Sequence, residues 1–196
     1  GASPESLVHQ NQDGIFKTMA LAGTQSVHDT NNEEITTSDA LWRQKEIEEQ
    51  ALVSRYIINC FKKIRVREFT ELGPKSVKAG NLIHLQTAFE VDTQAIEFKE
   101  LGSVMLDLLH PTSAVCGMPK EASQEFIDKT EQYDRKYYAG FLGPININEC
   151  TDLFVNLRTL RATSSTLSLY AGCGITTDSD PEKEWNETEI KLKTII

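Results

Sequence analysis

The longest regular pattern in this sequence is that of an amphipathic helix between residues 40 and 64. Apolar residues recur there every three or four positions, which is the spacing of one face of an α-helix. Ser38 or Asp39 precedes the pattern and is expected to cap the helix. The apolar positions are Leu41, Trp42, Ile47, Ala51, Leu52, Tyr56, Ile57, Cys60, Phe61 and Ile64. Any fold for this chain must accommodate one long helix among the strand-like segments on either side of it.

Those other segments are mostly short strands. Apolar and β-branched runs bounded by Gly or Pro turns predict strands at 16–24, 66–69, 76–77, 82–89, 137–147, 151–162 and 166–176. Helical spacing returns at 98–109 and 120–135, while 27–37 and 112–119 are expected to be loops. Because the last three strands follow one another closely, they are expected to form an antiparallel meander.

The composition is that of one ordinary globular domain and excludes several classes of function. The 196 residues are 39% hydrophobic and 25% charged, with a formal net charge of −9. A nucleic-acid surface needs clustered Lys and Arg, so an acidic chain of this kind is not expected to bind nucleic acid. No apolar run is long enough to span a membrane. Four cysteines without a CxxC spacing suggest neither zinc nor a disulfide scaffold, and a reducing cytoplasm fits best.

A candidate site lies at 170–191, where an apolar strand runs into Gly172 and Gly174. Ser179 or Asp180 is expected to cap a following helix, with Pro181 at its first position. On that helix the spacing of three and four residues places two carboxylates and an ammonium on one face. They are Glu184, Glu187 and Lys191. This face is either an ordinary solvated one, with acids favoured at a helix start, or half of a metal site.

A second pair of carboxylates, Glu46 and Glu49, occupies one stripe of the long helix. Two such pairs would supply the four oxygen ligands that a hard cation such as Mg²⁺ prefers. Elsewhere, Gly23 and Thr24 offer an amide and a hydroxyl to a carboxylate, although most such pairs are only turns. His84 lies in a predicted strand, where a histidine is more often a hydrogen-bonded structural residue than a catalyst.

Motifs along the whole chain resemble those of the chorismate-utilising enzymes and, within them, the isochorismate synthases. They are Ser3-Pro4-Glu5, Ala20-Leu21-Ala22-Gly23-Thr24, the segment 45–53, the segment 110–120, Tyr138-Ala139-Gly140, the strand with Arg158, Ala171-Gly172-Cys173-Gly174-Ile175, and Glu184-Trp185-Asn186-Glu187-Thr188 with Lys191. The resemblance implies an α+β fold with antiparallel β-sheets in the core and helices packed outside. It also implies that residues 1–196 are the C-terminal part of a single chorismate-binding catalytic domain, truncated at its N-terminus.

The resemblance carries roles over to individual residues. Glu46, Glu49, Glu184 and Glu187 match the Mg²⁺ ligands, and Glu5 matches the general acid, a carboxyl that must carry its proton when it acts. His84 matches a histidine near the substrate ring. The positions that match substrate-binding residues are Gly23, Thr24, Ala114, Tyr138, Arg158, Gly172, Gly174 and Lys191. These local donors and the metal suit a dianion such as chorismate, which an acidic protein could not otherwise bind.

The family's general base is a Lys that precedes the Ser-Pro-Glu motif, and nothing in this sequence matches it. We therefore expect the 196 residues by themselves to be inactive. Ala114 stands where amination and lyase members carry Thr, and Gln25-Ser26 replaces the Arg-Gly of anthranilate synthases. Gln50 replaces the usual His. Ala114 and Gln25-Ser26 favour isochorismate synthase, feeding menaquinone or siderophore biosynthesis, without a glutaminase partner, and Gln50 is a tolerable departure because the preceding Glu49 matches the metal ligand. The alternatives are a salicylate synthase, an anthranilate or aminodeoxychorismate synthase component, and a non-catalytic binding fragment.

Overall fold

The computed structural model describes residues 5–28, 33–193 and 195 of the chain. The chain forms two compact units. Among the described residues, the sheet unit comprises 5–28, 33–109 and 143–154, and the hairpin unit comprises 110–142, 155–193 and 195. Ser3 and Pro4 of the Ser-Pro-Glu motif lie outside the described residues, whereas Glu5 is described.

The sheet unit is an antiparallel sheet with helices. Its elements are β1 (Ser6–Gln10), β2 (Ile15–Ser26), α1 (Gln44–Lys63), β3 (Thr70–Ala79), β4 (Leu82–Asp92), α2 (Leu101–Leu109) and, apart from its last residue, β6 (Thr151–Val155). Neighbouring strands follow the order β3-β4-β2-β1-β6. In the long β2–β4 ladder Phe16 lies opposite Val91 and Ala20 opposite Thr87. This ladder forms the support for the helix that carries Glu46 and Glu49.

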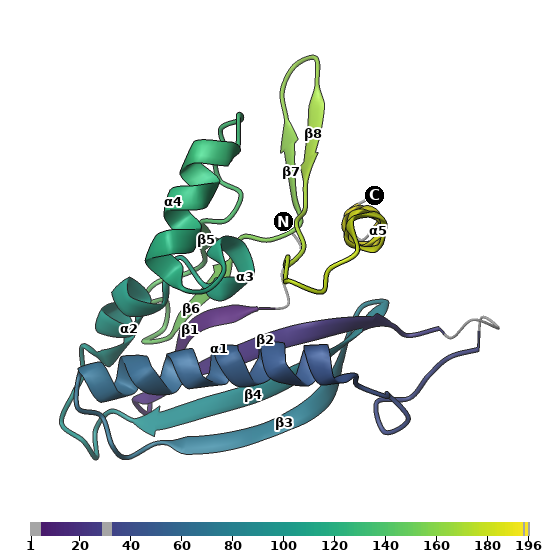
Figure 1. Ribbon diagram of the computed structural model, residues 1–196. Helices are drawn as coiled ribbons and strands as arrows, with labels where there is room; N and C mark the ends of the chain where they lie inside the picture. Colours follow the sequence, from purple (N-terminus) through teal and green to yellow (C-terminus); the bar gives the residue numbers. More distant parts are fainter. Residues whose placement is uncertain (1–4, 29–32, 194, 196) are drawn as a thin grey trace. The chain divides into compact units, whose positions relative to one another are not determined.

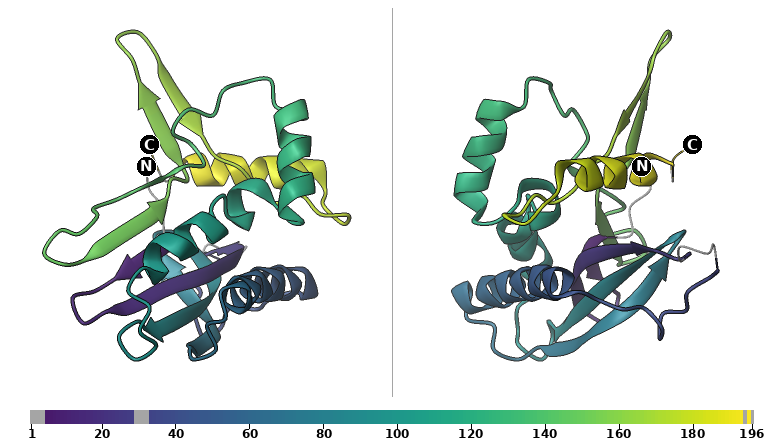
Figure 2. Two further views of the ribbon diagram at one scale, coloured as in Figure 1. Left: turned by 90° about the vertical axis from the view of Figure 1, so that its left-hand side faces the viewer. Right: turned by 45° about the vertical axis from the view of Figure 1, so that its right-hand side comes forward.

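Helix α1 packs its apolar face on this sheet, as Figures 1 and 2 show. Its buried residues are Gln50, Ser54, Ile57, Cys60 and Phe61, which recur at the helical spacing. The Phe61 ring meets Phe16 and Phe89 edge-on, with ring centroids 6.3 and 6.1 Å apart. Complete burial of a phenylalanine side chain contributes about 2–3 kcal/mol. The core of the sheet unit therefore fixes which side of α1 faces the sheet.

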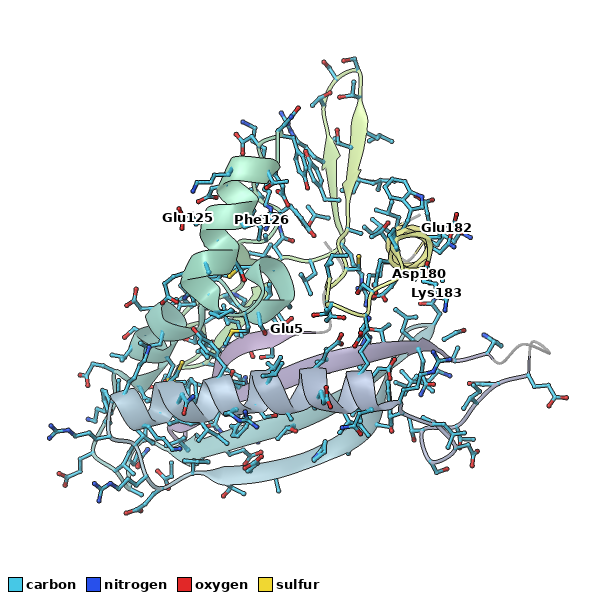
Figure 3. The ribbon with its side chains drawn as sticks, in the orientation of Figure 1. Glu5, Glu125, Phe126, Asp180, Glu182 and Lys183 are labelled. Atoms are coloured by element: carbon cyan, nitrogen blue, oxygen red, sulfur yellow. The ribbon has the colours of Figure 1, made fainter. Side chains whose placement is uncertain are left out.

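The hairpin unit contains short elements. They are α3 (Ser113–Cys116), α4 (Lys120–Thr130), β5 (Phe141–Leu142), β7 (Thr159–Ala162), β8 (Leu167–Tyr170) and α5 (Pro181–Leu192). Strands β7 and β8 form an antiparallel ribbon in which Thr159 lies opposite Tyr170. Asp180 caps α5 as expected, because its Oδ1 accepts hydrogen bonds from the backbone N–H groups of Glu182 and Lys183 at 3.1 and 3.0 Å. Figure 3 labels these three residues at the start of α5.

The long helix begins later than the sequence predicted. Its first residue is Gln44 and its N-cap is Arg43, whose backbone N–H donates to the Glu46 carboxylate at 2.9 Å. The predicted caps, Ser38 and Asp39, lie in a separate turn instead. There the Asp39 carboxylate accepts a hydrogen bond from the Thr36 hydroxyl, and the Ser38 hydroxyl is hydrogen-bonded to the same group. Side chains engaged in one turn cannot also cap a helix.

The predicted closing meander is correct only in part, since the antiparallel pairing of 151–162 with 166–176 is present as β7 with β8. The segment 151–162 is two strands, of which β6 pairs with β1 while β7 pairs with β8 in a separate sheet. The break falls where Arg158 adopts a φ of +41° and the Thr159 hydroxyl bonds the Asn156 side chain at 3.0 Å. An L-residue at positive φ cannot continue a strand.

Other strand boundaries also differ. Within 137–147 only Phe141–Leu142 is a strand, because Ala139 has a φ of +67°. β3 runs through Thr70–Ala79 rather than as the two short pieces 66–69 and 76–77. β1 was not predicted, because its five residues show no clear alternation. None of the described helices has the length and apolar character needed to cross a membrane.

Candidate functional site

The predicted site residues belong to both units. Glu5, Gly23, Thr24, Glu46, Glu49 and His84 lie in the sheet unit. Ala114, Tyr138, Arg158, Gly172, Gly174, Glu184, Glu187 and Lys191 lie in the hairpin unit. Each group has its own internal geometry, which is described in turn.

In the sheet unit, Gly23 forms a bulge in β2. The pairing of β2 with β4 shifts register between Ala22 and Thr24, and Gly23 has a φ of +66°. A Cβ at Gly23 would lie 3.1 Å from the Glu46 Cβ and 3.2 Å from the Trp42 ring. The glycine therefore allows the first turn of α1 to approach the strand closely.

His84 of β4 holds this bulge. Its ring Nδ1 lies 3.1 Å from the Gly23 carbonyl oxygen and 3.2 Å from the Thr24 hydroxyl. A carbonyl oxygen can only accept, so Nδ1 carries a proton and donates it to Gly23. The side chain is buried. His84 thus has the structural role that a strand histidine usually has, and a part in chemistry stays a prediction.

We expect Gly23→Ala to destabilise the protein more than Gly80→Ala. Both glycines have positive φ, but a Cβ at Gly80 meets nothing within 4 Å. The left-handed conformation costs an alanine about 1 kcal/mol at either position, and overpacking against α1 adds about 1–3 kcal/mol at Gly23 alone. Thermal unfolding of the two variants measures the difference; equal melting temperatures would contradict the close approach of α1.

The two α1 carboxylates are half-buried and already have polar neighbours. One Glu46 oxygen completes the helix cap at Arg43, and a Glu49 oxygen lies 3.9 Å from the Lys45 ammonium. One residue further, Gln50 is buried and donates from Nε2 to the Thr87 hydroxyl at 2.9 Å and the Ala20 carbonyl at 3.3 Å. Gln50 therefore anchors α1 to β2 and β4 beside both glutamates.

Glu5, the predicted general acid, directly precedes β1 and is buried, with 6% of its surface exposed. Figure 3 labels it at the start of the described chain. Burying a carboxyl costs free energy, so carboxyl side chains are rarely buried in proteins unless they have partners. The burial of Glu5 is therefore an unusual feature of this strand end.

In the hairpin unit, the two α5 carboxylates differ in environment. Glu184 is buried and accepts a hydrogen bond from the Ser179 hydroxyl at 2.7 Å. Glu187 is half-buried, and its Oε1 pairs with the Lys191 ammonium at 2.6 Å. Lys191 also donates to the Gly172 carbonyl at 3.0 Å, which ties α5 to the segment after β8. The solvated interpretation describes the Glu187–Lys191 pair in part, but it does not explain a buried Glu184.

Arg158 is buried where the chain turns from β6 into β7. Burial lowers the pKa of its guanidinium, whereas the negative charge of Glu187 acts in the opposite direction. A buried guanidinium presents a fork of N–H donors that matches a carboxylate. Its environment therefore suits an anionic ligand.

Tyr138 lies between an aromatic ring and a glycine. Its ring stacks on Tyr170 with centroids 5.6 Å apart, and its hydroxyl lies 2.7 Å from where a Gly172 Cβ would be. Burial raises the pKa of Tyr138 to about 12, so the phenol keeps its proton at neutral pH. Gly172 thus leaves room for the phenol, whereas a Cβ at Gly174 would meet nothing within 4 Å.

Ala114 is exposed on the short helix α3. The next residue, Val115, is buried, and its carbonyl accepts a hydrogen bond from Arg135 at 2.7 Å. Sequence reasoning did not single out Arg135. The signal that could have found it is Glu131 four residues earlier, the spacing of a helical ion pair.

The donor chemistry of the four glutamates fits Mg²⁺. Carboxylate oxygens are the ligands this hard cation takes, and Glu184 already has the buried, hydrogen-bonded character typical of a ligating carboxylate. Within the described ranges, no group of three or more His, Cys, Asp or Glu side chains is arranged to hold a metal ion. The convergence of Glu46, Glu49, Glu184 and Glu187 on one ion stays a prediction.

The chain thus combines an antiparallel α+β core with pairs of buried or half-buried carboxylates and a buried arginine. The sequence profile of the chorismate binding enzymes matches residues 1–196. The chain belongs to this family, which confirms the resemblance inferred from its motifs and the predicted fold class.

Known proteins of this family resemble the whole chain. The vibriobactin-specific isochorismate synthase of Vibrio cholerae is 29% identical over 196 residues, which are 100% of this chain and 49% of that protein. The isochorismate synthase MenF of Bacillus subtilis is 32% identical over 100% of this chain and 41% of its own length.

A solved structure has a similar fold. MenF, the menaquinone-specific isochorismate synthase of Escherichia coli, superposes with a TM-score of 0.79 at 27% identity, covering 97% of this chain and 43% of that one. The chain spans about half the length of the curated relatives it matches.

Proposed function

We propose that this chain is part of a Mg²⁺-dependent isochorismate synthase, which converts chorismate to isochorismate. The observation that carries the proposal is the match of the chorismate binding family over all 196 residues, with isochorismate synthases among the relatives that align over the full chain. Ala114 supports this branch over the amination and lyase branches, since it stands where those enzymes carry Thr.

The proposed reaction adds water at one ring carbon while the hydroxyl on another ring carbon leaves, so that the composition of the substrate does not change. Glu5 would act as the general acid that gives a proton to the leaving oxygen. The side chain of Glu5 is buried, as a group that must be shielded from solvent would be. The base that activates water is not assigned to a residue of this chain.

The chorismate carboxylates would be bound by local donors. Arg158 would form a bidentate pair with the enolpyruvyl carboxylate, and Tyr138 would donate from its neutral phenol. Lys191 would contribute positive charge from beside Gly172, with the amides of Gly172 and Gly174 as further donors. In the sheet unit, Gly23 and Thr24 would face the ring carboxylate, and His84, which fixes Gly23, would lie near the ring.

Glu46, Glu49, Glu184 and Glu187 would hold Mg²⁺. When bound, the ion would offset negative charge on the ring carboxylate of the substrate. The four glutamates themselves are positioned by protein contacts: the cap at Arg43, the Gln50 anchor, the Ser179 hydroxyl and the Lys191 ammonium. These contacts support preorganised ligands rather than mobile surface acids.

A cytoplasmic location belongs to the same proposal. All four cysteines are free thiols, the state that a reducing compartment maintains. Neither a glutaminase subunit nor nucleic acid is expected as a partner. The relatives include a vibriobactin-specific enzyme and a menaquinone-specific one, so the product would feed siderophore or menaquinone synthesis.

We expect the full-length protein to convert chorismate to isochorismate in the presence of Mg²⁺ without releasing pyruvate. Chromatography of the products, together with a lactate dehydrogenase assay for pyruvate, measures both quantities. Pyruvate with salicylate would assign the protein to the lyase branch, and an ammonia-dependent product would assign it to the amination branch. Chorismate binding without any product would support a non-catalytic module.

A further inference from the structure

The side chain of Arg135 connects three parts of the hairpin unit. Its Nε and Nη2 donate to the two carboxylate oxygens of Glu131 at 2.6 and 2.5 Å, and its Nη1 donates to the Val115 carbonyl at 2.7 Å. Its guanidinium carbon lies 5.7 Å from the centroid of the Tyr138 ring. One side chain thus contacts the end of α4, helix α3 and the Tyr138 loop.

One end of this connection, Tyr138, is a proposed substrate-binding residue, and the other end, Val115, lies next to one. Val115 immediately follows Ala114, the position that differs between branches of the family. Tyr138 places its hydroxyl against Gly172, whose carbonyl accepts from Lys191. A displacement of Arg135 would therefore reach Ala114 through α3 and Gly172 through the Tyr138 ring.

The Arg135–Glu131 pair, which follows α4, differs from the Lys129–Glu125 pair within α4. The Arg135 and Glu131 side chains are 23% and 27% exposed, whereas those of Lys129 and Glu125 are 72% and 68% exposed. Partial burial and two parallel hydrogen bonds make the first pair geometrically specific. The second pair is an ordinary surface pair with little effect on structure; Figure 3 labels its Glu125 on α4.

We propose that Arg135 is a positioning residue. It fixes the positions of α3 and the Tyr138 ring, and through them it sets the affinity for the chorismate carboxylates. This proposal rests on the proposed function for its substrate. Arg135 acts through the Val115 carbonyl and Tyr138, and it takes no part in proton transfer. A lysine at this position keeps the charge but cannot make the two bonds to Glu131 and the bond to Val115 together.

The test compares Arg135→Lys and Arg135→Met with the matched control Lys129→Met in the full-length protein. We expect both Arg135 variants to raise the KM for chorismate by about tenfold or more, as loss of charge-assisted hydrogen bonds implies. We expect kcat to change much less, with an unchanged pH profile. An unaltered KM, or a loss confined to kcat with a shifted pH profile, would overturn the proposal.

A second measurement does not depend on turnover. Cys116 follows Val115 and is buried, with its Sγ 3.7 Å from the Lys120 carbonyl. Burial raises the pKa of its thiol, so it should react slowly with a thiol reagent. The positive charge of Arg135 lowers the pKa of this thiol, so Arg135→Lys, which keeps the charge, is the informative variant. Peptide mapping after labelling should show Cys116 modified faster in Arg135→Lys than in the wild type or Lys129→Met. Equal labelling rates would refute the positioning role of Arg135, even if the wild type proved inactive on chorismate and the proposed function failed.

Discussion

Replacing Glu184 by Gln in the full-length protein is expected to raise the Mg²⁺ concentration for half-maximal activity by at least about tenfold, since even losing an outer partner of a metal ligand costs about 10–100-fold. Glu184 is buried in α5 and hydrogen-bonded to Ser179, so a neutral amide keeps its size but loses a charged oxygen ligand. Activity measured against Mg²⁺ concentration, together with calorimetric Mg²⁺ titration, gives the shift.

Glu182→Gln is the matched control for this prediction. Glu182 also lies in the first turn of α5 but is exposed, and the substitution removes the same charge from the same helix end. If acids were present there only to favour the helix dipole, the two variants would have equal and small effects of about 0.3–1 kcal/mol on stability. Similar Mg²⁺ dependence for both variants would therefore reject Glu184 as a ligand.

Replacing Arg158 by Lys is expected to lower kcat/KM for chorismate about 10–100-fold, because hydrogen bonds to a charged group contribute about 1.5–3 kcal/mol. Lysine keeps the positive charge but has no planar fork for a carboxylate. The control is Arg161→Lys on the same ribbon, where the arginine is exposed. Steady-state kinetics on chorismate compares the two. If Arg158→Lys and Arg161→Lys had the same kcat/KM, Arg158 would not be the carboxylate-binding residue.

Local sequence patterns predicted the elements whose causes are local. The α5 cap at Asp180 and its Pro181 start were predicted correctly, because capping depends on a few neighbouring residues. The α1 periodicity was also correct over most of its length. Its start was not, since Thr36 uses the predicted cap residues in a turn of its own.

Strand pairing could not be predicted from local patterns. The segment 151–162 appeared to be one strand, yet positive φ at Arg158 divides it, and β6 pairs with β1 from the other end of the chain. The partner of β6 is β1, a five-residue strand that the sequence did not predict, so this pairing could not be predicted either. Ladder partners are chosen by packing and backbone hydrogen bonds between distant segments, and neither appears in a short sequence window.

The sequence by itself determined the family, because the motifs that carry the resemblance extend along the whole chain. The metal and substrate roles of the two Glu pairs and of Arg158 stay predictions. Only the tertiary structure decided what surrounds such residues: Gly23 lies against Glu46, Gln50 of α1 bonds Thr87, and Arg135 lies between Val115 and Tyr138. Burial and close approach depend on what distant segments bring to a residue. That is why Glu184, which resembles an ordinary helix-start acid in the sequence, is distinguished from Glu182 by its burial in the folded chain.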